Sequence, residues 1–61
     1  MTQEEFDSTE FRKGMRVHHP IDGEGTITGV DFAENLIEVA FDGYVGENWC
    51  RYENITIINK P

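Results

Sequence analysis

The chain has few of the features that hold a small protein together covalently or place it in a membrane. It contains one cysteine, Cys50, in 61 residues, so no disulfide can form within it, and a lone thiol is typical of the reducing cytosol. No apolar stretch approaches the ~20 residues of a membrane span, and the acidic N-terminus lacks the apolar segment of a signal peptide. We therefore expect a cytoplasmic protein of one domain with a thin core, since chains of this size bury only ~60% of their unfolded surface.

Basic residues are also scarce. The chain has 5 Lys and Arg against 12 Asp and Glu, for a net charge of -7. This charge repels nucleic-acid backbones, which bind proteins largely through Lys and Arg, and it repels anionic membrane surfaces. A basic surface on a protein partner is the natural complement, although the same charge also serves solubility alone.

The acidity is concentrated at the start of the chain. Residues 1–10 carry four acids and no base, and we expect them to form a flexible acidic tail before a folded domain at residues 11–61. Thr2 and Glu5 have the spacing of a capping box, which permits a short helix. Such a helix is marginal in isolation and would need Phe6 or Phe11 to dock on the domain. We expect residues 1–9 to be mobile and Phe11 to pack.

From residue 11 onward, apolar residues alternate with polar ones, which predicts strands. Pro20 ends the first strand, Gly23 and Gly25 are suited to positive φ in the turn that follows, Gly29 predicts a bulge, and Asn35 is the expected left-handed residue of the next hairpin. The expected strands are residues 15–19, 26–32, 36–41, 47–51 and 56–58, with one helical turn at 52–55. Five short strands without room for a long helix predict an all-β fold, a small barrel.

The third expected strand has the clearest alternation. Ile37, Val39 and Phe41 are predicted to face the core, and Glu38 and Ala40 to face outward. This strand therefore supplies much of the predicted core.

Residues 14–27 carry a resemblance to a known family. Their sequence, Gly-Met-Arg-Val-His-His-Pro-Ile-Asp-Gly-Glu-Gly-Thr-Ile, resembles the Tudor-like (SH3-like) barrel at the C-terminus of bacterial UvrD/PcrA-type DNA helicases. More distantly it is similar to the RNA-polymerase-interacting domain of CarD and of transcription-repair coupling factors. The strand at 37–41 and the isoleucines at 55, 57 and 58 fit the same pattern, so the resemblance covers residues 11–58. It implies an SH3-like barrel that docks on RNA polymerase and has no catalytic role.

The sequence departs from this family at two places. Asp22 stands where the family has an aromatic residue, and residues 43–47 lack the family's basic residues. The partner surface is therefore expected to differ from that of the helicases. The short, acidic chain suggests a stand-alone adaptor of phage or mobile-element origin.

No constellation of catalytic or metal-binding residues is evident, so we expect no enzyme activity, metal or cofactor. His18 and His19 are adjacent on a strand and point to opposite faces; we expect His19 to pack and bond the turn backbone and His18 to be exposed. Cys50 has no His or Cys at metal-ligand spacing, and we expect it to pack as a small apolar residue. The remaining loop acids lack the pattern of a calcium loop: Asp22, Glu24 and Asp31.

Aromatic residues suggest where a partner binds. We expect five of them in or beside the loops at one end of the barrel: Phe32, Phe41, Tyr44, Trp49 and Tyr52. Such residues can form a cation–π cage for methylated Lys or Arg or an interface hot spot, whereas Phe41 is expected in the core. If Cys50 points inward, Trp49 and Arg51 point outward. The predicted partner-binding residues are Tyr44, Trp49, Tyr52, Asp42, Glu47 and Arg51, with Glu53 on the acidic rim.

Three functions are compatible with these features. The first is a monomeric protein-binding adaptor that docks on a basic, partly apolar surface of a transcription or repair machine. The second is a nucleic-acid-binding barrel in which the bases cluster: Arg12, Lys13, Arg16, Arg51 and Lys60. The third is an acidic DNA mimic that blocks a DNA-binding protein. The net charge opposes the second, and the mixture of acids with bases opposes the third.

Overall fold

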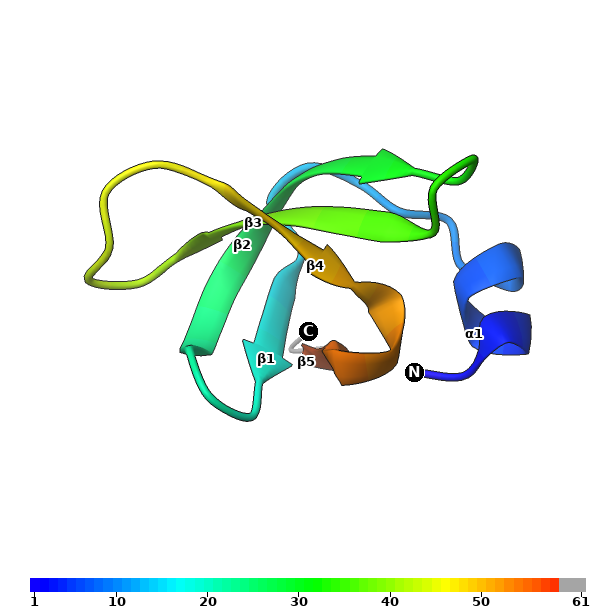
Figure 1. Cartoon of the computed structure of the whole chain (residues 1–61), viewed down its shortest axis with the longest axis horizontal. Helices are drawn as coiled ribbons and strands as arrows, with labels where there is room; N and C mark the ends of the chain where they lie inside the picture. The colour runs from blue at the N-terminus through cyan, green and yellow to red at the C-terminus, as the bar shows by residue number, and fades with distance from the viewer. Residues whose placement is uncertain (59–61) are drawn as a thin grey trace.

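A computed structural model describes residues 1–58. The fold is small and mostly β, built on one antiparallel five-stranded sheet with the order β4-β3-β2-β1-β5 (Figure 1). Its elements are α1 (Gln3–Ser8), β1 (Arg16–His19), β2 (Gly23–Asp31), β3 (Leu36–Phe41), β4 (Asn48–Arg51), the 3-10 turn η1 (Tyr52–Asn54) and β5 (Thr56–Ile58). The five expected strands and the single helical turn before the last strand are present, but β2 begins at Gly23 and not at Thr26, because residues 23–25 of the expected turn pair with β1. Lys60 lies outside the described residues.

The strand β2 is the central element, because it belongs to two pairings. Its first half pairs with β1, from His19 opposite Gly23 to Arg16 opposite Thr26. Its second half pairs with β3 up to Asp31. The register shifts between Ile27 and Gly29, which confirms the predicted bulge; a bulge bends the strand and increases its twist.

The turn residues agree with the sequence at two of three positions. Asn35 has φ 59° and Gly23 has φ 82°, as expected. Gly25 does not have positive φ; it is a buried residue of β2 opposite Phe41. A Cβ at this position would lie 2.6 Å from Val39 Cγ1 and 2.8 Å from the Ala40 carbonyl oxygen. Gly25 is therefore required by the close approach of β3, not by turn geometry.

The core forms where the apolar faces of the strands meet. Ile37, Val39 and Phe41 are buried on β3, which confirms the predicted alternation. The other buried apolar residues are Phe6, Val17, Ile27 and Ile55. Phe11 packs against this cluster, also as expected.

The first ten residues differ from the predicted flexible tail. Residues 3–8 form α1, whose capping box is complete: the Thr2 hydroxyl accepts from the Glu5 N–H, and the Glu5 carboxylate accepts from the Thr2 N–H. Phe6 is fully buried and stacks on Tyr52 with ring centroids 4.8 Å apart. Docking of this one side chain offsets the low intrinsic stability of a six-residue helix, so the segment is part of the fold.

Candidate protein-binding surface

Large apolar side chains are left uncovered at one end of the sheet. Ile21, in the turn between β1 and β2, is 86% exposed. Tyr44 is 55% exposed and Val45 fully so, both in the loop between β3 and β4. We call these three residues the apolar tip. Scattered exposed apolar residues are ordinary, but a group on adjacent loops marks a surface that can be covered by a partner.

The pairing of the strands places these two loops at the same end. Gly23 begins β2 directly after the Ile21 turn, and Phe41 ends β3 opposite Gly25. The Asp42 N–H donates to the Glu24 carbonyl over 2.9 Å, so the second loop starts beside the first. Figure 1 shows the β3–β4 loop projecting from the sheet on the side away from α1.

Carboxylates outnumber bases around the tip. The acids at this end are Asp22, Glu24, Asp42 and Glu47. Arg16 meets two of them: its guanidinium donates to both carboxylate oxygens of Asp42, with Glu24 3.5 Å away, and to the Thr26 hydroxyl at 2.8 Å. This arrangement links β1 and β2 to the start of the loop. The tip as a whole keeps a negative field.

The contact between Arg16 and Asp42 shifts the pKa of both groups, and the helix cap shifts that of Glu5. Hydrogen bonding from Arg16 holds the pKa of Asp42 below its usual range, and this effect outweighs the opposing effect of desolvation. The same contact raises the pKa of Arg16. On α1, the hydrogen bond from the Thr2 backbone lowers the pKa of Glu5. Both shifts favour the ionised form of the carboxylates of Asp42 and Glu5.

The turn that carries Ile21 is fixed by a histidine. Nδ1 of His19 accepts the backbone N–H groups of Ile21, at 3.1 Å, and Asp22, at 3.3 Å. The His19 ring meets Phe41 edge-on with centroids 5.8 Å apart, whereas His18 is exposed. The predicted division of labour between the two histidines is confirmed.

The structure divides the predicted partner-binding residues among three places. Asp42, Tyr44 and Glu47 lie in the β3–β4 loop. Arg51 stands opposite Leu36 at the other end of β3, and Tyr52 packs on Phe6 while its hydroxyl donates to Gln3 Oε1 at 2.8 Å.

Trp49 lies between the two ends of β3, opposite Glu38 on the outer face of the sheet, and its side chain is half exposed. Cys50, its neighbour, packs against the core, so the expected outward orientation of Trp49 and Arg51 is confirmed.

The aromatic residues form two groups, not the predicted single one. Phe41 approaches Tyr44 with centroids 6.3 Å apart. Phe32 instead lies against Phe6, 5.0 Å between centroids, at the far end of the β2–β3 hairpin, near Tyr52. Five residue steps separate these ends in the register, roughly 17 Å of extended chain. The five predicted aromatics therefore do not form one cage.

Cys50 keeps the character of a partly buried apolar residue. Burial, and to a lesser extent the charge of Asp22, raise the pKa of its thiol, which lowers its reactivity. Among residues 1–58, no group of three or more potential ligands is placed to hold a metal ion. The acids Asp22, Glu24 and Asp31 have other roles, the last accepting from the Ala33 and Glu34 N–H groups.

The arginines do not form a free basic surface. Arg12 pairs with Glu10, Arg16 with Asp42 and Glu24, and Arg51 with Glu53. Of the four bases within residues 1–58, only Lys13 makes no ion pair there. This reduces the charge available for a nucleic-acid backbone.

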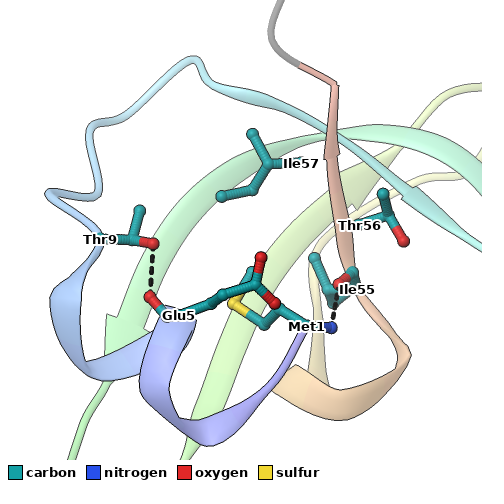
Figure 2. Close-up of a pocket in the computed structure, with 6 residues that line it drawn as sticks. All are labelled: Met1, Glu5, Thr9, Ile55, Thr56 and Ile57. Carbon is teal, nitrogen blue, oxygen red and sulfur yellow. Dashed lines mark hydrogen bonds between the residues drawn. The ribbon is translucent and has the colours of Figure 1, made fainter.

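A hollow of about 220 Å³ separates α1 from β5 (Figure 2). Its lining consists of Met1, Glu5, Thr9, Ile55, Thr56 and Ile57. The Met1 nitrogen donates to the Ile55 carbonyl at 2.7 Å, and the Thr9 hydroxyl donates to the Glu5 carbonyl. These polar groups already have hydrogen-bond partners within the chain, and the bonds hold α1 in place. We therefore assign the hollow a structural role.

No protein family, no curated protein and no solved structure matches the chain. Within residues 1–58, no helix has the length and apolar character needed to cross a membrane.

Two parts of this surface are not evident from the sequence. Ile21 follows Pro20 in a turn and is not part of an alternating strand pattern. Its position after a proline is the only feature of the sequence that indicates an exposed side chain. The Arg16–Asp42 contact joins residues 26 positions apart, and no local sequence pattern predicts it.

Proposed function

We propose that this protein is a protein-binding adaptor that docks through its apolar tip on a basic, partly apolar surface. The observation that carries the proposal is the exposure of Ile21, Tyr44 and Val45 at an end of the sheet rich in carboxylates. Tyrosine is among the residues enriched at interface hot spots. The surrounding charge would steer a basic partner toward the tip and repel an acidic one.

The strand order, the bulged β2 and the 3-10 turn before β5 support a small SH3-like or Tudor-like barrel. With the His-Pro-x-x-Gly-x-Gly run of residues 19–25, they support the resemblance to the C-terminal domains of UvrD/PcrA-type helicases and to CarD. On this basis, bacterial RNA polymerase is the first partner to test. Trp49 and Glu47 are proposed to extend the contact beyond the tip.

The test is a binding measurement between the immobilised chain and purified bacterial RNA polymerase, with a bacterial lysate in parallel. The triple variant Ile21→Ser, Tyr44→Ser, Val45→Ser removes the apolar tip without touching a buried residue. A matched control, Phe32→Ser, removes an equally exposed aromatic from the other end. Loss of polymerase binding in the triple variant alone supports the proposal. Binding by neither the unaltered chain nor the control rejects the polymerase as partner, and equal binding by all three rejects the tip.

A further inference from the structure

An aromatic side chain and a carboxylate converge on the outer face of the sheet. Trp49 of β4 stands opposite Glu38 of β3, and Glu38 stands opposite Gly29 of β2. A Cβ at Gly29 would lie 3.0 Å from Glu38 Oε1 and 3.7 Å from Trp49 Cη2. The carboxylate and the end of the indole ring therefore lie over the same glycine, close enough for one small group to contact both.

The carboxylate of Glu38 is held in place within the sheet. Its Oε1 accepts a hydrogen bond from the Thr28 hydroxyl at 3.0 Å. The two oxygens of a carboxylate together accept about four hydrogen bonds, so this bond leaves most of their capacity free. Within residues 1–58, Glu38 makes no ion pair. It therefore offers a positioned negative charge to a ligand.

Trp49 supplies an aromatic surface beside this charge. It is 51% exposed, and tryptophan is the aromatic residue that attracts cations most strongly. The bases that share this face, Arg16 on β1 and Arg51 on β4, contact Asp42 and Glu53 respectively. Their charges are therefore already matched by carboxylates other than Glu38.

From this geometry we propose that Trp49 and Glu38 bind a single arginine side chain of the protein partner. The proposal rests on the function proposed above, since it names a residue that the partner offers. A guanidinium is planar, stacks on aromatic faces and donates to carboxylates through a rigid fork. It can thus contact the indole and the carboxylate together.

Charge and position both favour this occupant. The net charge of -7 attracts a cationic group and repels an anionic one. The strand β4 begins at Asn48, directly after the loop that carries Tyr44 and Val45. A partner seated on the apolar tip therefore reaches Trp49 along the same loop.

The test uses the tripeptide acetyl-Gly-Arg-Gly-amide and the NMR signal of the indole N–H of Trp49, the single tryptophan of the chain. We expect a saturable shift with a dissociation constant on the order of ten millimolar, as suits one exposed side-chain site. The matched peptide with citrulline has nearly the same shape without the charge and should bind about fivefold more weakly. The lysine peptide should bind about threefold more weakly, because an ammonium is more strongly hydrated and cannot stack.

Variants assign the binding to the two side chains. Glu38→Gln keeps an oxygen for the Thr28 hydroxyl but removes the charge, and should weaken arginine binding about threefold. Trp49→Leu removes the ring and should weaken binding about fivefold, measured from the amide signal of Gly29. The control Glu34→Gln removes an exposed carboxylate from the β2–β3 loop and should leave the affinity unchanged. It separates local contact from the general attraction of an acidic protein.

Three results would overturn the inference. The first is a shift that does not saturate or that is equally large with the citrulline peptide. The second is an equal loss of affinity in Glu38→Gln and Glu34→Gln, which would reduce the effect to net charge. The third is equal affinity for the lysine peptide, which would exclude a preference for arginine.

The arginine site and the adaptor function can fail separately. The tripeptide experiment does not involve RNA polymerase, so a negative result there rejects the arginine site and leaves the adaptor function standing. Polymerase binding that is lost in the triple tip variant but unchanged in Glu38→Gln has the same meaning. Tripeptide binding without polymerase binding supports the arginine site and rejects the polymerase as the partner.

Discussion

At the residue scale, His19 determines the conformation of the turn that presents Ile21. Its ring is held against Phe41, and its Nδ1 accepts two backbone N–H groups that have no other acceptor among the bonds of residues 1–58. A protonated Nδ1 cannot accept these bonds. The turn at the tip therefore depends on this one side-chain acceptor.

This role predicts different outcomes for two substitutions of His19. The change His19→Ala leaves both N–H groups without their acceptor and should lower the free energy of unfolding by about 2 kcal/mol. The change His19→Asn keeps an oxygen acceptor close to the position of Nδ1 and should recover about half of that loss. Urea unfolding of the three proteins measures both differences. Equal loss in the two variants would show that ring packing, and not the turn, is what His19 provides.

Gly25 and Gly29 provide a second comparison on a single strand. A Cβ at Gly25 meets Val39 and the Ala40 backbone within 3.0 Å, whereas at Gly29 it first meets the Glu38 carboxylate, the end of a flexible side chain. We expect Gly25→Ala to lower the free energy of unfolding by about 2–3 kcal/mol through overpacking. Gly29→Ala should lower it by less than about 1 kcal/mol. Thermal unfolding of both variants decides this. Similar losses would mean that β3 does not approach β2 this closely.

At the element scale, α1 is held by one side chain and one cap. Phe6 is fully buried among Phe11, Phe32 and Tyr52, and Thr2 and Glu5 close the first turn. The change Phe6→Ala should cost about 3 kcal/mol, a large part of the total stability of a small domain. Thr2→Ala should cost about 1 kcal/mol. Calorimetry measures both, and an unchanged unfolding temperature in Phe6→Ala would show that the segment is a tail after all.

The strands were predictable because alternation is a local signal. The limits of β3 and β5, the bulge at Gly29 and the left-handed Asn35 follow from patterns a few residues long. The docking of α1 was not predictable, because its capping box indicates only a marginal helix and the burial of Phe6 depends on residues near position 52. Likewise, the separation of Tyr44 from Tyr52 depends on strand register, which no single stretch of sequence encodes.

The candidate site was predictable in part for the same reason. Tyr44 lies in a glycine-flanked loop, and both its exposure and that of Trp49 agree with the sequence. Ile21 was missed because turns have no alternation to interpret. Asp42 was predicted to face a partner, but Arg16, from a distant strand, takes up its carboxylate.

At the scale of the whole molecule, acidity affects stability as well as binding. The pKa values of Asp42 and Glu5 are lower in the folded chain than in the unfolded chain. Their contribution is therefore complete above the unfolded-state pKa, about 4, and is lost as the pH falls through the lower folded-state values. We expect the unfolding temperature to fall below about pH 4.

The double variant Asp42→Asn, Glu5→Gln serves as the control for this prediction. Neither substituted side chain titrates, so the decline of unfolding temperature with acid should be shallower than in the unaltered chain. Both groups are exposed, so the difference should be small. A decline of the same slope would assign acid sensitivity to other carboxylates.

At the same scale, the proposed adaptor function rests on one end of the molecule. The tip offers uncovered apolar side chains in an acidic field. The three residues of the tip are not part of the core, which closes around residues of the strands and Phe6.

The measurement that tests the central claim most directly is site-specific photo-crosslinking to RNA polymerase. A benzophenone amino acid replaces Tyr44 in the tip and, in a separate protein, Glu34 in the hairpin loop at the other end. The account predicts a crosslink to one polymerase subunit from position 44, abolished by Ile21→Ser and Val45→Ser, and none from position 34. Crosslinks of equal strength from both positions, or from position 34 alone, would contradict it.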